Sequence, residues 1–147
     1  MTVGIVGLGF VGGAMYKSFR EKGELCVGYD KFKNGGIGSL QQLLILDILF
    51  FCLPTLFSKE KCQYDKSAII EVCQYLEENN YEGLIVIKST VEPETTDDLS
   101  KHFNLQICHN PEFLTARTAY EDFHNQDHIV LGKGKNCTDE NMKKLED

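Results

Sequence analysis

The sequence has no surplus of positive charge, no long apolar run and no ordered set of cysteines. Its 147 residues carry 15 Lys and Arg against 22 Asp and Glu, a formal net charge of -7. This balance argues against a generic basic surface for nucleic acid or an anionic membrane. The most apolar stretch, LLILDILFFCL, is too short to span a bilayer and is interrupted by Asp47.

Two further absences concern the cellular compartment. No signal peptide is expected, because sequence typical of folded structure begins at Thr2. The six cysteines are scattered and include no C-x-x-C pair. They are therefore interpreted as reduced thiols of a cytoplasmic protein, several of them small core residues.

What remains is the composition of an ordinary globular protein, 42% apolar and 25% charged, without repeats. Its length predicts a single domain over residues 1–147. Short apolar runs predict strands within 2–9, 25–30, 47–54, 83–90, 105–110 and 128–132 (HIVLG). Helices are expected from Val11 to Gly23, around 69–76, from Pro93 and from Thr138. This alternation predicts a doubly wound, Rossmann-type α/β fold, mainly parallel, with helices on both faces.

The first predicted strand runs into a complete G-x-G-x-x-G motif that opens a helix. Its residues are Gly7, Leu8, Gly9, Phe10, Val11 and Gly12. Gly7 allows the tight turn, Gly9 lets the backbone approach a pyrophosphate, and Gly12 permits close packing of helix on strand. The helix N-terminus adds N–H donors and a positive dipole end. The motif therefore predicts a dinucleotide-binding loop.

A carboxylate supports this prediction and bears on the choice of cofactor. Asp30 ends the second predicted strand, eighteen residues after Gly12. Near this spacing a carboxylate meets the adenosine ribose 2′-hydroxyl, and it would repel a 2′-phosphate, so NAD is predicted rather than NADP. Lys31 is placed beside the cofactor with Asp30. Either Lys31 or Lys33 could pair with a phosphate, although two solvated lysines are the simpler interpretation.

Three more motifs follow predicted strands, where an open parallel sheet binds its ligands. They are CLPT (52–55), KSTV (88–91) and NPEFL (110–114). In this order after GLGFVG, they resemble the N-terminal domain of the UDP-glucose/GDP-mannose dehydrogenase family. The resemblance covers essentially the whole chain, and NPEFL after STV is its most discriminating part. It implies an oxidoreductase that uses two NAD per turnover to convert the C6 alcohol of a nucleotide-linked sugar to a carboxylate.

The resemblance also implies roles for single residues. Glu112 matches a glutamate that acts as acid/base or orients water, and Thr90 matches a threonine that holds the water or oxyanion. The residues implied to line the cofactor are Cys52, Leu53, Pro54 and Thr55, with Phe51 before them, and Ser89 and Thr90 near the nicotinamide. On the residues alone, Thr90 could instead cap the next helix.

The neighbours of Glu112 add a physical argument. Pro111 is expected to stiffen the loop, with Phe113 and Leu114 packed inward and the carboxylate facing the cleft. Such apolar surroundings would raise the pKa of Glu112 toward neutrality. The alternative is a carboxylate on an exposed loop.

The sequence departs from the family pattern in several places. A second glutamate that often follows NPEFL is missing from the segment 115–117, which reads Thr-Ala-Arg. Glu92 and Glu94 stand where the family has apolar or small residues, and the segment between Asp30 and CLPT is short. No cysteine lies in the glycine-rich motif that carries the family's nucleophile.

Three functions stay open at this point. The first is a nucleotide-sugar dehydrogenase present as its NAD-binding half, partnered by a second domain or a full-length chain. The second is a stand-alone module that binds NAD or a nucleotide sugar without turnover. The third is a hydroxyacid dehydrogenase of the 6-phosphogluconate or 3-hydroxyisobutyrate type, which lacks NPEF.

The histidines give no metal site. His124 and His128 have the i, i+4 spacing of a helical chelate, but His128 opens the predicted strand HIVLG, so the rings would not share a helical face. His109, ahead of NPEFL, is interpreted as structural.

Overall fold

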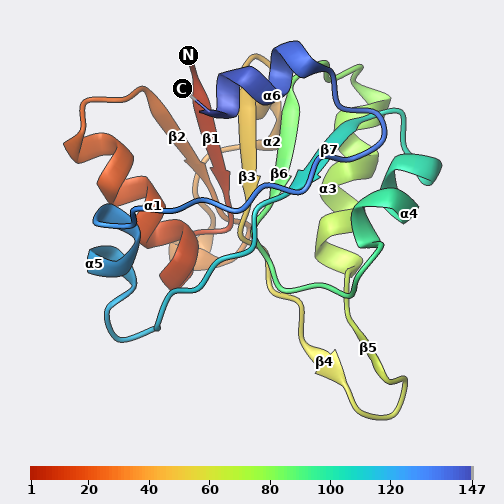
Figure 1. The fold of residues 1–147 in the computed structure, drawn as a ribbon, viewed down its shortest axis with the longest axis horizontal. Coiled ribbons are helices and arrows are strands. Elements are labelled where there is room, and N and C mark those ends of the chain that lie inside the picture. The colour runs from red at the N-terminus through yellow and green to blue at the C-terminus, as the bar shows by residue number, and fades with distance from the viewer. Residues whose placement is uncertain (147) are drawn as a thin grey trace.

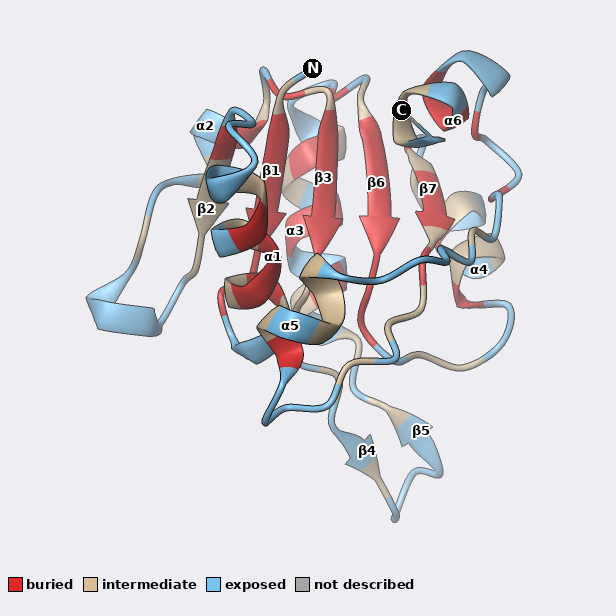
Figure 2. Cartoon of the chain, turned by 60° about the vertical axis from the view of Figure 1, so that its left-hand side comes forward, coloured by how far each residue is buried: buried red, intermediate tan, exposed pale blue. Residues whose placement is uncertain are grey.

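The centre of the fold is one sheet of five parallel strands, seen in a computed structural model that describes residues 1–146. The strand order is β2-β1-β3-β6-β7. The strands are β1 (Val3–Val6), β2 (Cys26–Tyr29), β3 (Ile48–Phe51), β6 (Leu84–Ile87) and β7 (Gln106–His109). Every residue of β1, β3 and β6 is buried (Figure 2), as expected for parallel strands covered on both faces.

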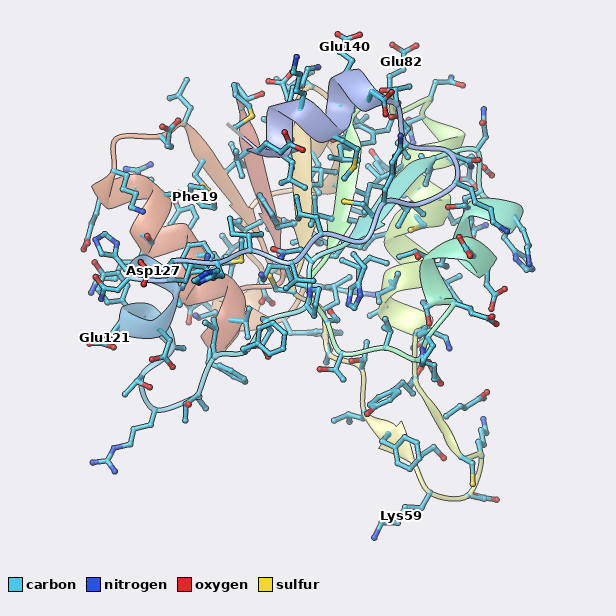
Figure 3. The ribbon with its side chains drawn as sticks, in the orientation of Figure 1. Phe19, Lys59, Glu82, Glu121, Asp127 and Glu140 are labelled. Carbon is cyan, nitrogen blue, oxygen red and sulfur yellow. The ribbon has the colours of Figure 1, made fainter. Side chains whose placement is uncertain are left out.

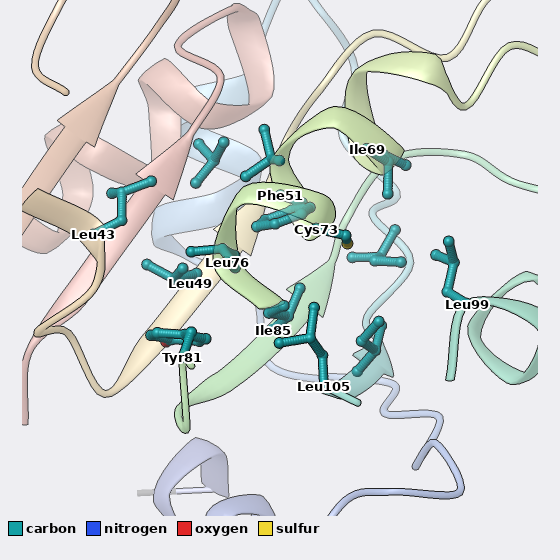
Figure 4. Close-up of a cluster of buried hydrophobic side chains, with 14 of the residues drawn as sticks. Leu43, Leu49, Phe51, Ile69, Cys73, Leu76, Tyr81, Ile85, Leu99 and Leu105 are labelled. Carbon is teal, nitrogen blue, oxygen red and sulfur yellow. The ribbon is translucent and has the colours of Figure 1, made fainter. Parts of the chain in front are cut away.

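Helices cover both faces of this sheet, which confirms the predicted fold class (Figure 1). They are α1 (Phe10–Glu21), α2 (Leu40–Leu43), α3 (Ser67–Glu78), α4 (Thr95–His102), α5 (Ala119–His124) and α6 (Asp139–Glu146). On one face Leu43, Leu76 and Leu99 bring α2, α3 and α4 into a single apolar cluster (Figure 4). On the other, Met15 of α1 and Met142 of α6 share a second cluster, against which α5 packs.

All five strands end in the same row. The paired last residues are Val6 with Tyr29, Val6 with Phe51, Phe51 with Ile87, and Ile87 with His109. The residues that come next along each strand are Asp30, Gly7, Cys52, Lys88 and Asn110. We call these five residues the carboxyl row. Except at Asp30, each donates its N–H at 2.8–2.9 Å to the last residue of a neighbouring strand, so the row is held in register.

The helix ends follow the expected signals. Gly23, at φ +82°, ends α1, and its N–H donates to Arg20 O while that of Glu24 donates to Phe19 O. This is the paired bonding of a Schellman motif. Thr138 precedes α6, and its hydroxyl accepts the Asn141 N–H at 3.2 Å.

Two predictions of secondary structure are wrong. Residues 128–132 form no strand: Gly132 makes one antiparallel bridge to His109, and Ile129 is 58% exposed. The segment between α5 and α6 runs across the strands rather than along them (Figure 1), so it cannot extend the ladder. Pro93 does not open α4 either. It lies in the preceding turn, and α4 begins at Thr95 after Glu94 at φ +70°.

The short segment after Asp30 makes β2 an edge strand. It holds a 3-10 turn, Lys33–Gly35, and the single turn α2. The resulting strand order is the flavodoxin-like form of the doubly wound fold, whose switch point lies between β1 and β3. Within residues 1–146, no helix has both the length and the apolar character needed to cross a bilayer.

A hairpin that was not predicted from the sequence projects beyond the carboxyl end of the sheet (Figure 1). It pairs β4 (Phe57–Ser58) with β5 (Gln63–Tyr64), and Lys59 lies in its turn (Figure 3). Glu92 ties the hairpin to the loop after β6, since its carboxylate accepts the Tyr64 N–H at 2.7 Å and Lys66 Nζ at 2.8 Å. These bonds, that of Lys66 foremost, lower the pKa of Glu92 to about 2. Glu92, an acidic residue where the family pattern has an apolar or small one, therefore has a structural role.

Replacing Glu92 by Gln is expected to destabilise the protein in a pH-dependent way. The pKa of Glu92 is lower in the folded chain than its ordinary 4.5. Its contribution, about 1 kcal/mol, is therefore complete above about pH 4.5 and is lost as the pH falls toward 2. Urea unfolding between pH 7 and pH 3 measures this, with the exposed Glu94→Gln as control. A difference from wild type that stays constant over this range would contradict this role of the ionised Glu92.

Candidate functional site

A cleft of about 450 Å³ opens along the carboxyl ends of the strands, on both sides of the switch point. It is lined by Gly7, Gly9, Phe10, Val11, Asp30, Phe32, Cys52, Leu53, Pro54, Thr55, Lys88, Ser89, Thr90 and Glu112. The fold thus brings together most of the site residues predicted from sequence. Of those predicted, Leu8, Gly12, Lys31 and Phe51 do not line it.

The glycine loop has the geometry that an anion-binding turn requires. Gly7 has φ +93°, and a side chain there would meet Cys52 O at 2.5 Å. A Cβ at Gly12 would overlap the Gly7 carbonyl oxygen, so α1 can approach β1 this closely only with glycine. At Gly9 nothing lies within 4 Å, which leaves room beside the N-terminus of α1. These features fit a pyrophosphate on the helix N-terminus.

Leu8 and Gly12 serve this loop without facing the cleft. The Leu8 side chain is buried in the cluster beneath α1, while its N–H donates to Asp30 Oδ2 at 2.8 Å.

The Asp30 carboxylate is held by backbone on both oxygens. Besides the bond from Leu8 to Oδ2, Oδ1 accepts the N–H groups of Phe32 and Lys33 at 2.9 and 2.8 Å. Partial burial acts to raise the pKa of Asp30, but these backbone bonds and the Lys33 charge together lower it. The carboxylate is thus ionised, oriented and able to accept a further hydrogen bond.

The two lysines after Asp30 have protein partners. Lys31 Nζ lies 2.7 Å from Glu71 Oε1, with both side chains about half exposed, and outside the cleft. Lys33 Nζ donates to Leu8 O at 2.7 Å. Lys31 is therefore not placed to line a cofactor, contrary to its inclusion among the predicted contacts, and both lysines already have a protein partner.

The loops after β3 and β6 are tied together. Thr55 donates its hydroxyl to Thr90 O at 2.6 Å, and Ser89 Oγ lies 2.7 Å from Leu53 O. Phe51, expected near the cofactor, is instead fully buried in the core. Thr90 is exposed and does not cap α4, which begins five residues later. Thr90 therefore lines the cleft rather than a helix end.

Cys52 lines the cleft in surroundings that disfavour a nucleophilic role. Its Sγ lies 3.7 Å from Met15 Sδ, and burial raises the pKa of the thiol to about 12. A thiol reacts as the thiolate, which this environment disfavours.

Glu112 faces the same cleft as Thr90 and the glycine loop, as the sequence predicts. Its Oε2 accepts the Leu114 N–H at 2.7 Å, which fixes the carboxylate in a local turn. Phe113, however, is 79% exposed, so the inward packing predicted for it is wrong. A side chain between Glu112 and the half-buried Leu114 has to point away from the turn that these two residues form. The apolar enclosure expected from Phe113 is therefore not present.

Lys88 is a cleft residue that was not singled out from the sequence. Its side chain is 2% exposed, and Nζ donates to Asn110 Oδ1 at 2.8 Å. Asn110 in turn donates to Val130 O at 2.8 Å, which fastens the segment that crosses the sheet. Burial lowers the pKa of Lys88, while Cys52 and Glu112 act in the opposite direction. The signal that could have found it is its position directly after the apolar run LIVI, in the same row of strand ends as the other cleft residues.

Large apolar side chains stand exposed around the cleft. Phe10 and Phe32 line its glycine-loop end and are 54% and 79% exposed, with Phe113 near Glu112. Leu56 and Phe57, 77% and 53% exposed, extend the group onto the hairpin. Large apolar side chains exposed on neighbouring loops are typical of interaction surfaces.

The histidines lie apart from the cleft. His124 ends α5, and its Nδ1 lies 2.9 Å from Ser18 Oγ in the wall of a second cavity of about 330 Å³ between α1, α5 and α6. Burial lowers the pKa of His109. Residues 1–146 hold no cluster of three or more His, Cys, Asp or Glu that could bind a metal ion.

The comparisons bear on the third of the open alternatives, the hydroxyacid dehydrogenases. Residues 39–146 match the model of the UDP-glucose/GDP-mannose dehydrogenase family, NAD binding domain. The chain belongs to this family. The match includes CLPT, KSTV and NPEFL, whereas the glycine loop and Asp30 precede it and rest on the geometry above.

Single relatives agree with this membership. UDP-glucose 6-dehydrogenase of Rickettsia felis is 35% identical over 94 residues, 60% of this chain and 21% of that enzyme. GDP-mannose dehydrogenase from Pseudomonas aeruginosa, solved as a ternary complex, has a TM-score of 0.78 at 22% identity, over 99% of this chain and 43% of that one. The chain thus spans less than half the length of these relatives.

Likeness of fold alone does not separate the family from the hydroxyacid dehydrogenases. Mycobacterium tuberculosis 3-hydroxyisobutyrate dehydrogenase has a TM-score of 0.71 at 12% identity, over 98% of this chain and 49% of that one. The family match, not the fold, therefore favours the nucleotide-sugar dehydrogenases.

The contact between Gly7 and Gly12 gives a sharp test of the loop. Gly12→Ala is expected to lower the free energy of unfolding by at least about 3 kcal/mol, because its methyl would overlap backbone. Gly13→Ala is the matched control. The methyl group added at Gly13 would meet only Leu8 O, at 3.6 Å. This substitution should therefore leave the free energy of unfolding unchanged or raise it by up to about 1 kcal/mol. Equal urea midpoints for the two variants would contradict so close an approach of α1 to β1.

Proposed function

We propose that this chain is the NAD-binding part of a nucleotide-sugar dehydrogenase and that it binds NAD in the cleft along the carboxyl row. The observation that carries the proposal is the single cleft shared by the glycine loop, Asp30, Thr90 and Glu112. Asp30 is oriented to accept from a ribose hydroxyl, and the N-terminus of α1 suits the pyrophosphate. The family's NAD-binding description supports the same cofactor.

In the complete protein, bound NAD would accept a hydride from the alcohol carbon of a sugar such as that of UDP-glucose. Glu112 would take the hydroxyl proton or orient a water, and the bond from Leu114 N–H holds its carboxylate in place for this. The Thr90 hydroxyl would donate to the oxygen on which negative charge develops. Leu53, Pro54 and Thr55 would pack against the cofactor between these groups and the glycine loop.

A second domain, or a full-length partner chain, would complete the site and hold the nucleotide sugar. The exposed apolar side chains around the cleft supply a surface for it. The six free cysteines fit the reducing conditions of the cytoplasm, where we place the protein.

A second candidate function is a binding module that does not turn over. The observation that favours it is that Cys52, the thiol that lines the cleft, contacts Met15 Sδ at 3.7 Å, in surroundings that raise its pKa and disfavour the thiolate. The second oxidation step proposed for this family needs a reactive thiol to trap an aldehyde. The 147-residue chain by itself is therefore expected to bind NAD without oxidising UDP-glucose.

Titration calorimetry with NAD and NADP tests the cofactor assignment. The chain should bind NAD at least about tenfold more tightly than NADP, because Asp30 repels a 2′-phosphate. Asp30→Ala should weaken NAD binding by about tenfold and reduce the preference for NAD over NADP. Asp98→Ala, which removes an exposed acid on α4, should change neither the NAD affinity nor this preference. NADP binding as tight as that of NAD in the wild-type chain would contradict the assignment.

Glu112→Gln tests the chemical role in a complete enzyme made by joining this domain to a compatible second half. Turnover is expected to fall at least about 100-fold, while NAD affinity changes by less than about twofold. Steady-state kinetics and calorimetry separate the two effects. A parallel loss of NAD affinity would instead assign Glu112 a structural role.

A further inference from the structure

Lys88 is a buried cation for which the proposed chemistry gives no role. Its ammonium has three N–H donors, and its contacts are the neutral Asn110 amide and the ring of Phe123, whose centroid lies 6.0 Å away. Among the ion pairs formed within residues 1–146, none includes Lys88. A buried charge without a contacting counterion is costly, so its retention in a cleft wall points to a ligand-directed role.

The position of Lys88 in the carboxyl row defines which end of the cleft it occupies. Asp30 follows β2 and Lys88 follows β6, with β1 and β3 between them. Adjacent strands lie about 4.8 Å apart, so three spacings separate these residues by about 14 Å. A dinucleotide with its adenosine ribose at Asp30 and its pyrophosphate at α1 therefore extends its nicotinamide toward Lys88 and Glu112. This step rests on the proposed function.

The two oxidation states of the cofactor differ in charge at that end. The nicotinamide ring is positively charged in NAD⁺ and neutral in NADH. A fixed cation nearby repels the first and not the second, and the repulsion is stronger where water is excluded. The Glu112 carboxylate, in the same cleft, attracts the positively charged ring of NAD⁺.

We propose that Lys88 makes the cleft discriminate between the oxidation states of its cofactor, weakening the binding of NAD⁺ relative to NADH. Because binding and redox equilibria are linked, the same charge makes bound NAD⁺ a stronger hydride acceptor. The Glu112 carboxylate partly offsets the effect of Lys88 on NAD⁺ binding. The two charges together therefore set the preference of the cleft for NADH over NAD⁺.

A purely structural role for Lys88 has a different signature. The bonds from Lys88 to Asn110 and from Asn110 to Val130 hold the cleft wall, and losing them would weaken both cofactor forms together. The ratio of the two dissociation constants is therefore diagnostic, whereas either constant alone is not.

The test measures the affinity of the 147-residue chain for NAD⁺ and NADH by calorimetry at constant ionic strength. In Lys88→Met, the ratio Kd(NAD⁺)/Kd(NADH) is expected to fall about tenfold. Lys88→Arg should keep the wild-type ratio, and Glu112→Gln should raise it only slightly, by less than about twofold. Lys101→Met, which removes an exposed lysine on α4, should leave it unchanged. Lys88→Gln, able to hydrogen-bond Asn110, serves if Lys88→Met does not fold.

The outcomes separate this inference from the proposed function. If the wild-type chain and the Lys88 variants bind both cofactor forms with one common ratio, the inference is overturned and NAD binding stands. If the wild-type chain binds neither form, the proposed function fails and the inference fails with it. A lower ratio in Lys88→Met with no change in Lys101→Met supports the inference.

Discussion

The common register of the five parallel strands is the constraint on which the site depends. Each strand is four residues long, and all five end at mutually paired positions. The next residues, from Asp30 at one edge to Asn110 at the other, are therefore placed side by side although they are up to 103 residues apart in sequence. A slip of one residue in any strand would turn its side chains to the opposite face. It would remove that strand's contribution to the cleft.

The row combines tight packing at one end with buried charge at the other. Near β1, Gly7 and Gly12 let the α1 N-terminus lie almost on the backbone of the first turn. Beyond the switch point, Lys88 is held in a largely apolar wall by Asn110, and Glu112 stands on the loop that follows Asn110. The N-terminus of α1 favours an anion such as a pyrophosphate, and the Lys88 charge interacts with the charge of a nicotinamide ring at the other end. The two ends of the cleft thus suit the two ends of a dinucleotide.

Much of this arrangement follows from local sequence signals. The runs VGIV, ILFF and LIVI are too apolar for any exposed position, and the glycine spacing after the first run has a specific steric meaning. The failures came where tertiary context decided the outcome. HIVLG has the composition of a strand, but its chain crosses the sheet, and Phe113 looked like a core residue although its loop turns it to solvent. Lys88 was overlooked because a charged residue after a strand is ordinarily exposed, and its burial depends on Asn110, which is far away in sequence.

Backbone amide NMR of the isotopically labelled chain with added NAD⁺ tests directly whether the carboxyl row binds a dinucleotide. Chemical-shift changes are expected at Gly7–Gly12, around Asp30, at Ser89 and Thr90, and at Glu112. Residues of the second cavity, such as Ser18 and His124, should be unaffected. Changes confined to that cavity, or none at saturating NAD⁺, would contradict dinucleotide binding at the row.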